Sequence, residues 1–344
     1  MRLKGLSLAV FVLVFISGCE QTANQDSHAP AEVSADELLR FISQVKGNLV
    51  FVEGGDFLMG DYGVQHGPER LPYDADKDSK PLHRVELSSY SIDRFKITNH
   101  AYQFYLRSNG LKLRGVESWD EKDWRDINSE PTVPAHLDWY EAEKYCSWLA
   151  RISDLPFSLP TEAQWEYAAR SRGQFLMVAT DDGTYKATND PVTESWESGP
   201  KGINISSSSD RSTFGKQMGW KTDLLTPLPV DRFPPNPLGL YSMSDNGYEW
   251  VKDWYDPDYY QYSPTKDPQG PASPTFKDPA SNNKHAKVLR GLDYADPRWG
   301  GGVNVHRSYS SPDAHYPSFV TEGEILLISD KTARCVVNVA GPLS

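Results

Sequence analysis

Apolar and polar residues follow short patterns that change from one region of the chain to the next. The stretch "SADELLRFISQVK" predicts a short helix, with Ser34 as N-cap and acidic residues in the first turn, where the helix dipole favours them. "LVFVEGGDFLMGD" alternates apolar and small residues, which predicts a hairpin turning at Gly54 and Gly55. "HRVELSSYSIDRFKITN" adds two strand-like runs.

Two later stretches have helical spacing and clear end signals. "NHAYQFYLRSNG" is helical in pattern and ends at Asn109 and Gly110, as a left-handed C-terminal cap would. The apolar residues of "LDWYEAEKYCSWLARI" fall on one face of a helix, and Asp138 and Glu141 can form a capping box at its start. Both stretches are therefore predicted to be helices.

The stretch "LPTEAQWEYAARS" could form either a catalytic site or a purely structural helix. Thr161 and Gln164 complete a second capping box, so this stretch also begins a helix. Glu162 and Glu166 share the i, i+4 spacing that places both carboxylates on one side. A paired-carboxylate acid/base site would need that side to face a cleft. We favour the alternative, a solvated edge with one glutamate bonded to neighbouring backbone, and interpret this helix as part of the frame.

The remaining pattern is rich in loops. Residues 171–225 carry little helix or strand signal, and a polar, proline-rich loop covers residues 256–287. Strand-like runs return in "KVLRGLDY" and twice in "EILLISDKTARCVVNV". Short strands, few helices and long loops predict a single α+β domain without an internal repeat. Long irregular segments inside such a domain often carry binding function.

Composition narrows the function classes. The chain has 344 residues, of which 38% are hydrophobic and 24% charged, so it can bury a substantial core. The formal net charge of -12 argues against nucleic acid as a partner, because phosphate contacts need Lys and Arg. The eight histidines include no closely spaced pair, so the spacing does not support a multi-histidine metal site.

The N-terminus has the layout of an export signal. Basic residues precede an apolar run that is too short for an ordinary membrane span. The ending "ISGC" resembles a bacterial lipobox, so we predict a lipoprotein signal peptide over 1–18, lipidation of Cys19 and a lipid-anchored flexible tether over 19–36. The alternative is an ordinary signal peptide with a chance cysteine. Glu20 follows the cysteine where an Asp would favour the inner membrane, which indicates an outer-membrane lipoprotein facing the periplasm of a Gram-negative bacterium.

Seven stretches between about residues 49 and 339 form a recognisable series: "FVEGGDFLMG", "SIDRFKITNHAYQFY", "PAHLDWYEAEKYCSWL", "LPTEAQWEYAARS", "VDRFPPNPLGLYSMSDNGYEW", "VLRG" and "ARCVV". In order and approximate spacing they resemble the formylglycine-generating enzyme family. The family has the sulfatase-modifying-factor fold, a variant of the C-type-lectin-like fold. The resemblance implies one α+β domain, which we place at 37–344, with short antiparallel strands and long ordered loops. A scaffold does not carry its chemistry with it, so activity needs separate evidence.

The resemblance implies a copper chemistry that this chain is not equipped to perform. The family's enzymes bind copper(I) through two cysteine thiolates, activate oxygen and oxidise a sulfatase cysteine to formylglycine. The corresponding region here, residues 288–312, contains no cysteine. The chain has 3 cysteines, and the resemblance implies that Cys146 and Cys335 form a structural disulfide. We therefore expect no copper and no formylglycine generation.

Calcium is the second metal that the resemblance implies. "SDNGYEW" resembles a family calcium loop, with Asn246 and Glu249 at the side-chain ligand positions beside loop backbone oxygens. This predicts one structural calcium ion; the alternative is that both residues bond loop backbone with no ion. At the other family site Asn204 and Ile205 are kept, but Met218 stands where an Asp should be, so that site is expected to be empty.

A residual cleft near the lost cysteines is a further candidate. Asp293, Tyr294, Asp296 and His306 could surround another metal, although their spacing is not diagnostic. The alternative is that the two aspartates cap turns while His306 packs on the surface. We interpret the chain as a non-catalytic protein-binding module in the periplasm, for example an immunity protein against a secreted toxin or an accessory to an envelope complex. The rival hypothesis is an oxidoreductase of the same family with a non-copper metal centre.

Overall fold

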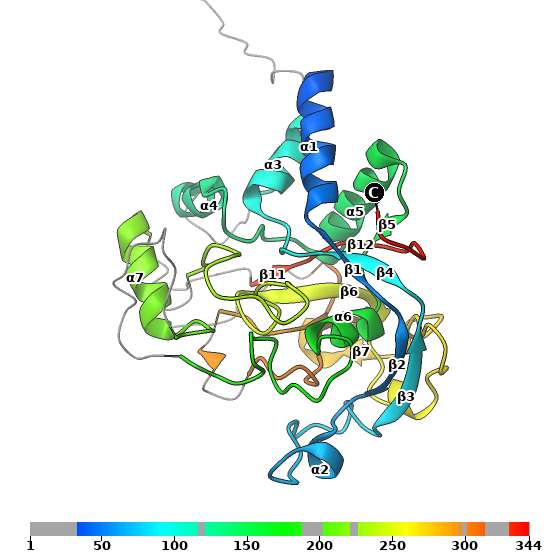
Figure 1. Cartoon of the computed structure of the whole chain (residues 1–344). Helices are drawn as coiled ribbons and strands as arrows, with labels where there is room; N and C mark the ends of the chain where they lie inside the picture. Colours follow the sequence, from blue (N-terminus) through cyan, green and yellow to red (C-terminus); the bar gives the residue numbers. More distant parts are fainter. Residues whose placement is uncertain are drawn as a thin grey trace, which may run out of the picture. The chain divides into compact units, whose positions relative to one another are not determined.

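The described part of the chain folds around two small sheets and a set of short helices. The computed structural model describes residues 33–115, 121–187, 202–220, 226–294, 296–297, 301–313 and 330–343. Within these residues there are seven α-helices, two four-stranded sheets and two two-stranded ribbons (Figure 1). The predicted signal peptide, Cys19 and nearly all of the tether lie outside the described residues.

The two longest helices begin at the caps that the sequence predicts. Ser34 caps α1 (Ala35–Gly47) and Asp138 caps α5 (Trp139–Ser153), each completing a capping box with the glutamate three residues on. Because α1 begins at Ala35, the folded domain starts before the tether boundary expected at residue 36.

Shorter helices complete the set. Thr161 caps α6 (Glu162–Ala169) through the predicted capping box with Gln164. Gly110, just beyond α3 (Asn99–Ser108), has φ 63°, which confirms the left-handed stop. The others are α2 (Gly63–His66), α4 (Glu121–Ser129) and α7 (Ser208–Met218). The sequence pattern missed α7, although Ser207 and Asp210 form a capping box at its start.

The first sheet joins segments from both ends of the chain. It consists of β1 (Leu49–Val52), β4 (Tyr90–Asp93), β12 (Val336–Val337) and β5 (Phe157–Ser158), in that order and antiparallel throughout. The predicted hairpin at Gly54 and Gly55 is wrong, because β1 pairs with β4, while β2 (Gly55–Met59) pairs with β3 (His83–Leu87). A Cβ on Gly54 would lie 2.2 Å from the Leu87 oxygen, so this glycine permits a close crossing instead of a hairpin turn.

The second sheet carries the region that corresponds to the family's copper site. Its strand order is β10 (Ser308–Ser310), β9 (Lys287–Arg290), β6 (Tyr248–Trp254) and β11 (Lys331–Thr332), with β11 parallel to β6. A ribbon of β7 (Lys277–Asp278) and β8 (Lys284–His285) and two short 3₁₀ turns, Tyr259–Gln261 and Pro279–Ser281, lie nearby in sequence.

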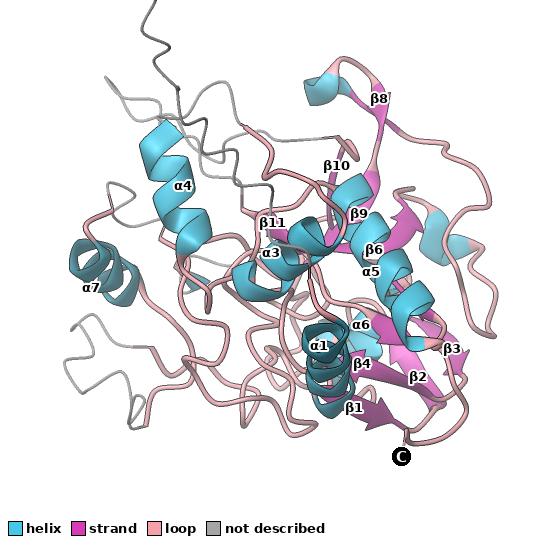
Figure 2. Cartoon of the chain, turned by 90° about the horizontal axis from the view of Figure 1, so that it is seen from above, coloured by secondary structure: helices cyan, strands magenta, loops and turns pink. Residues whose placement is uncertain are grey.

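Two helices organise the core. Helix α6 packs against β2, β3, β6 and β9, with Trp165 completely buried. Helix α5 packs against α1, α3 and β5, and these helices gather on one side of the sheets (Figure 2). Cys146 of α5 forms a disulfide with Cys335, which confirms that pairing. The predicted α+β architecture of few helices, short strands and long loops is confirmed for the described residues.

Candidate functional site

The two glutamates of α6 point into the core. Glu162 and Glu166 are only 1% and 0% exposed. Arg290 of β9 reaches both carboxylates, with Nη1 2.8 Å from Glu162 Oε1 and Nη2 2.9 Å from Glu166 Oε2. Arg170 adds a second contact to Glu166, Nη1 to Oε1 at 2.8 Å. The expected solvated edge is therefore wrong: these carboxylates are buried, and they pair with Arg170 of the same stretch and with Arg290 from a distant strand.

Arg307 holds Glu162 at two points, Nε to Oε1 at 2.7 Å and Nη2 to Oε2 at 3.0 Å. Burial alone would raise the pKa of the Glu162 carboxyl, but the Arg307 and Arg290 guanidinium groups outweigh burial and lower it. An ionised carboxylate has no proton to give, so Glu162 with both oxygens bonded to arginines cannot serve as a general acid. The structure thus supports the interpretation of α6 as part of the frame.

Glu249 of β6 is the third buried glutamate in this part of the core. Its Oε1 accepts from Lys96 Nζ at 2.8 Å and its Oε2 from Arg334 Nε at 2.7 Å, while Trp165 Nε1 donates to Oε2 at 3.0 Å. Burial raises the pKa of Glu249, but Arg334 and Lys96 overcome it and hold the pKa at about 2. We call the surrounding set of ion pairs the Trp165 network: Glu162, Glu166, Glu249, Lys96, Arg170, Arg290, Arg307 and Arg334.

The calcium ion expected at Asn246 and Glu249 does not fit these contacts. Both Glu249 oxygens already accept from buried cations, and Lys96 Nζ also donates to Gly247 O at 2.7 Å, so an ammonium group lies among the expected calcium ligands. Asn246 Oδ1 accepts from Leu228 N at 2.9 Å, and its Nδ2 donates to Leu228 O at 2.8 Å. The alternative is that both residues bond loop backbone without an ion. This alternative holds for Asn246, whereas Glu249 forms ion pairs with Lys96 and Arg334.

The second family calcium position is also used differently. Asn204 Nδ2 donates to Asp181 Oδ1 at 2.8 Å and to Thr184 O at 3.0 Å, and its Oδ1 accepts from Lys186 N at 2.8 Å. The Asn204 side chain therefore holds the turn at residues 181–186 in place. Met218, which replaces the expected Asp, is exposed at the end of α7.

Three residues of the expected residual cleft, Tyr294, Asp296 and His306, contact different partners. Asp296 Oδ2 accepts from Ser208 N at 3.1 Å at the start of α7, and Tyr294 Oη lies 2.8 Å from His136 Nε2. Burial raises the pKa of Tyr294 and lowers that of His136 to about 4. In the described part of the chain, Asp293, Asp296 and His306 do not place ligand atoms close enough to share a metal ion. The expectation of one cleft is corrected, and the capping role suggested for Asp296 is found.

His306 faces the loop that follows β2. We define the α2 loop as residues 60–82, which include α2 and lie at the opposite end of the domain from the start of α1 (Figure 1). Asp61 ties this loop together, with Oδ1 accepting from Gly63 N at 2.9 Å and from Tyr73 N at 3.2 Å. His306 Nδ1 lies 3.5 Å from Asp74 Oδ2. Sequence reasoning overlooked this loop, although the acidic run "DADKDSK" was a signal of dense charge.

The α2 loop also presents apolar side chains to solvent. Val64 and Leu71 are 53% and 63% exposed, and Phe175, from outside the loop, is 47% exposed. The Phe175 ring stacks on His66 with a centroid distance of 4.3 Å and packs beside Tyr62 at 4.9 Å, so Phe175 lies against the loop that carries Val64 and Leu71. We call Val64, Leu71 and Phe175 the apolar tip. Gathered exposed apolar side chains mark an interaction surface more often than scattered ones do.

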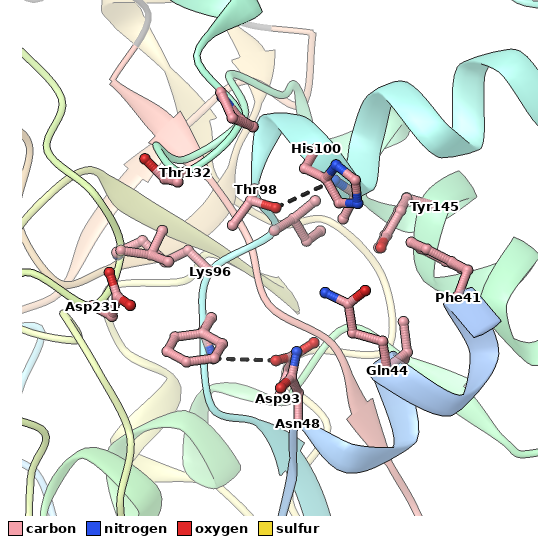
Figure 3. A pocket seen from close by; sticks show the side chains of 16 residues that line it. Phe41, Gln44, Asn48, Asp93, Lys96, Thr98, His100, Thr132, Tyr145 and Asp231 are labelled. Atoms are coloured by element: carbon pink, nitrogen blue, oxygen red, sulfur yellow. Dashed lines mark hydrogen bonds between the residues drawn. The ribbon is translucent and has the colours of Figure 1, made fainter. Parts of the chain in front are cut away.

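A cavity of about 380 Å³ lies at the other end of the domain, between α1 and the start of α3 (Figure 3). Phe41 and Gln44 of α1 and Tyr145 of α5 line one side, and Lys96 and Asp231 lie on the opposite side. Lys96 reaches the cavity wall but its ammonium group is committed to Glu249. The lining is largely apolar.

The lipidation expected at Cys19 concerns a residue outside the described part of the chain. Among the described residues, no helix combines the length and apolar character that crossing a membrane requires. The anchor therefore stays a prediction from the N-terminal sequence.

Comparison with known proteins shows the family to which this chain belongs. Residues 39–320 match the sulfatase-modifying factor enzyme 1-like domain. A formylglycine-generating enzyme from Streptomyces coelicolor is 27% identical over 289 residues, covering 71% of this chain and 78% of the relative. A serine/threonine-protein kinase pkn1 from Chlamydia caviae is 29% identical over 243 residues, covering 67% of this chain; the match spans 32% of the kinase.

Solved structures agree on the fold. PvdO from Pseudomonas aeruginosa superposes with a TM-score of 0.56 at 20% identity, covering 85% of this chain and 94% of PvdO. At that identity the likeness shows the fold alone. The family match spans most of the chain, and the sheets and the disulfide lie within or next to it. The chain belongs to the family of the sulfatase-modifying factor enzyme 1-like domain.

Proposed function

We propose that this chain is an outer-membrane lipoprotein, anchored through Cys19, whose formylglycine-generating-enzyme-like domain binds a protein partner in the periplasm and is not a catalyst. One observation carries the proposal. Of the 3 cysteines in the sequence, Cys146 and Cys335 are joined to each other and Cys19 is the predicted lipidation site. No thiolate pair is then left to hold copper(I), which hydroxyls and carboxylates bind poorly.

The apolar tip supports the binding role and supplies its surface. Val64 and Leu71 belong to the α2 loop, and α2 lies at the opposite end of the domain from the start of α1 (Figure 1). The apolar area that they and Phe175 expose is available for contact with a soluble protein. The partner is a periplasmic protein, such as a secreted toxin that this lipoprotein neutralises or a subunit of an envelope complex.

The binding role is tested by capture from native envelopes with the full lipidated chain. A Leu71→Asp, Phe175→Asp double variant should lose the partner that the wild-type protein retains. Leu111→Asp is the matched control, since Leu111 is also an exposed leucine (49%) but follows α3. Equal retention by all three proteins would move the binding surface away from the apolar tip.

The rival function is an oxidoreductase with a non-copper metal centre. Reduced, copper-loaded protein incubated with oxygen and a Cys-x-Pro-x-Arg peptide should give no aldehyde above the metal-only control, as judged by peptide mass. Turnover above that control would overturn the binding-module proposal, because it would show that the chain is a catalyst. The anchor is tested separately: intact mass of detergent-extracted protein should show a diacylglycerol adduct on Cys19 and loss of residues 1–18.

A further inference from the structure

One cluster of metal-ligating side chains has a different ligand set from the copper site and the two calcium sites that the family resemblance implied; only His306 comes from the region 288–312. Asp74 and Asp76 come from the α2 loop, and His306 comes from the segment just before β10. One ligand atom from each of the three side chains lies within 4.8 Å of the others. The chain thus brings two carboxylates and an imidazole together from segments more than 200 residues apart in sequence.

Asp74 is the reason to regard this cluster as more than a charged surface. Its side chain is buried, at 4% exposure for the residue, yet its Oδ2 has no hydrogen-bond partner and faces His306 Nδ1 at 3.5 Å. The other oxygen, Oδ1, accepts from Asp76 N at 2.9 Å, which fixes the carboxylate in this orientation. Buried polar atoms are nearly always satisfied, and leaving a carboxylate oxygen unpartnered is costly. A bound cation would remove that cost.

The loop holds Asp74 before any ion binds. Asp61 Oδ2 accepts from Asp74 N at 3.2 Å, and Lys80 Nζ donates to Asp74 O at 2.8 Å and to Asp76 O at 2.5 Å. Lys80 is therefore directed at backbone oxygens and at Asp61, 3.3 Å from its Oδ2. The ammonium group offsets one of the three carboxylate charges of Asp61, Asp74 and Asp76, and the local charge stays negative.

The donor set selects the class of ion. An imidazole nitrogen with two carboxylates suits divalent first-row transition ions, whereas calcium wants six to eight oxygens. Asp76 is exposed, and the His306 side chain is 33% exposed, so positions on the solvent side of the ion stay open to water or to a ligand. We propose that Asp74, Asp76 and His306 form a binding site for a divalent transition-metal ion, with Asp74 Oδ2 as the buried anchoring ligand.

The test is metal binding by the full-length protein, stripped with chelator and titrated with Mn²⁺ and with Zn²⁺. Calorimetry should show one ion per chain, and the Mn²⁺ electron paramagnetic resonance signal should broaden on binding. Asp74→Asn and His306→Gln should each weaken binding at least about 10-fold, because each removes one of three protein ligands. Asp56→Asn, at an exposed aspartate of β2 paired with Arg84, should bind as the wild type does.

Two results would overturn the site. One is a wild-type protein that binds neither ion; the other is binding that Asp74→Asn and His306→Gln leave unchanged. Because His306 is partly exposed, His306→Gln keeps the test valid even if the change at Asp74 impairs folding, which circular dichroism would report. Metal binding is measured without any partner or peptide, so its outcome is independent of the binding-module proposal.

Discussion

The Trp165 network and the α2 loop both bury carboxylates, but they satisfy them to different degrees. In the network, every carboxylate oxygen of Glu162, Glu166 and Glu249 accepts from an arginine or a lysine. In the α2 loop, Asp74 Oδ2, Asp78 Oδ1 and Ser79 Oγ are buried without a hydrogen-bond partner. The two regions touch, because Gly60 N at the start of the loop donates to Glu166 Oε1 at 3.0 Å.

The difference separates a region that holds the fold from one that is prepared for a ligand. A buried carboxylate without a cationic partner destabilises the folded protein. In the Trp165 network each carboxylate has such partners, so none is available to take part in a reaction. Buried oxygens without hydrogen-bond partners and exposed apolar side chains both destabilise the folded protein. Such destabilising features are expected at functional sites. Four measurements test this contrast, and they are arranged by expected size.

The largest effect should come from the network. Glu249→Ala leaves the ammonium of Lys96 and the guanidinium of Arg334 buried without their carboxylate, so the free energy of unfolding should fall by about 3–5 kcal/mol. Urea denaturation measures it. Asp56→Ala is the control, because that carboxylate is exposed and pairs with an exposed Arg84. Equal losses for the two variants would mean that the network does not stabilise the fold as proposed.

The disulfide should come next. Replacing Cys146 and Cys335 together by alanine removes a link across a sequence separation of 189 residues. The free energy of unfolding should fall by about 2–5 kcal/mol, since the unfolded chain regains freedom. Thermal unfolding measures the loss. A double variant that melts at the wild-type temperature would show that packing of α5 against β5 suffices without the link.

A smaller, pH-dependent effect should appear beside the network at Asp253, which accepts from Glu162 N at 2.9 Å. Burial, and then the charge of Glu162, raise the pKa of Asp253 to about 7. The folded state therefore keeps a proton that the unfolded state has lost, and stability falls as pH rises from about 4 to about 7.

The variant Asp253→Asn cannot ionise and keeps an acceptor for Glu162 N. Its free energy of unfolding should rise relative to wild type by about 1 kcal/mol between pH 6 and pH 8. Urea titrations at both pH values measure the difference. Parallel pH profiles for the two proteins would show that Asp253 is ionised throughout this range.

The smallest effect should come from the α2 loop. Asp74→Asn keeps the acceptor for Asp76 N, and its Oδ2 has no hydrogen bond to lose. In metal-free protein the free energy of unfolding should change by less than about 1 kcal/mol. A loss as large as that of Glu249→Ala would place Asp74 among the fold-holding groups and erase the contrast between the regions.

The sequence predicted the features that depend on residues close to each other along the chain. The caps at Ser34, Asp138 and Thr161 each depend on a partner three residues away, and all three are confirmed. The Cys146–Cys335 pairing came from the family resemblance, since no local pattern connects residues so distant in the chain.

What the sequence could not show depends on distant partners. The burial of Glu162 requires Arg290 and Arg307, each more than 120 residues away, so spacing on the helix alone favoured a solvated edge. The role of Glu249 was missed for the same reason. The sequence of its loop resembles a calcium site, and the ion pair with the distant Lys96 cannot be predicted from that loop. The meeting of Asp74 with His306 likewise follows from tertiary structure alone.

The place of β12 has a consequence for how the protein is made. This strand, at residues 336–337, lies between β4 and β5, so the first sheet stays incomplete until the last part of the domain has been synthesised. The Cys146–Cys335 disulfide follows the same order, because Cys335 is synthesised 189 residues after Cys146.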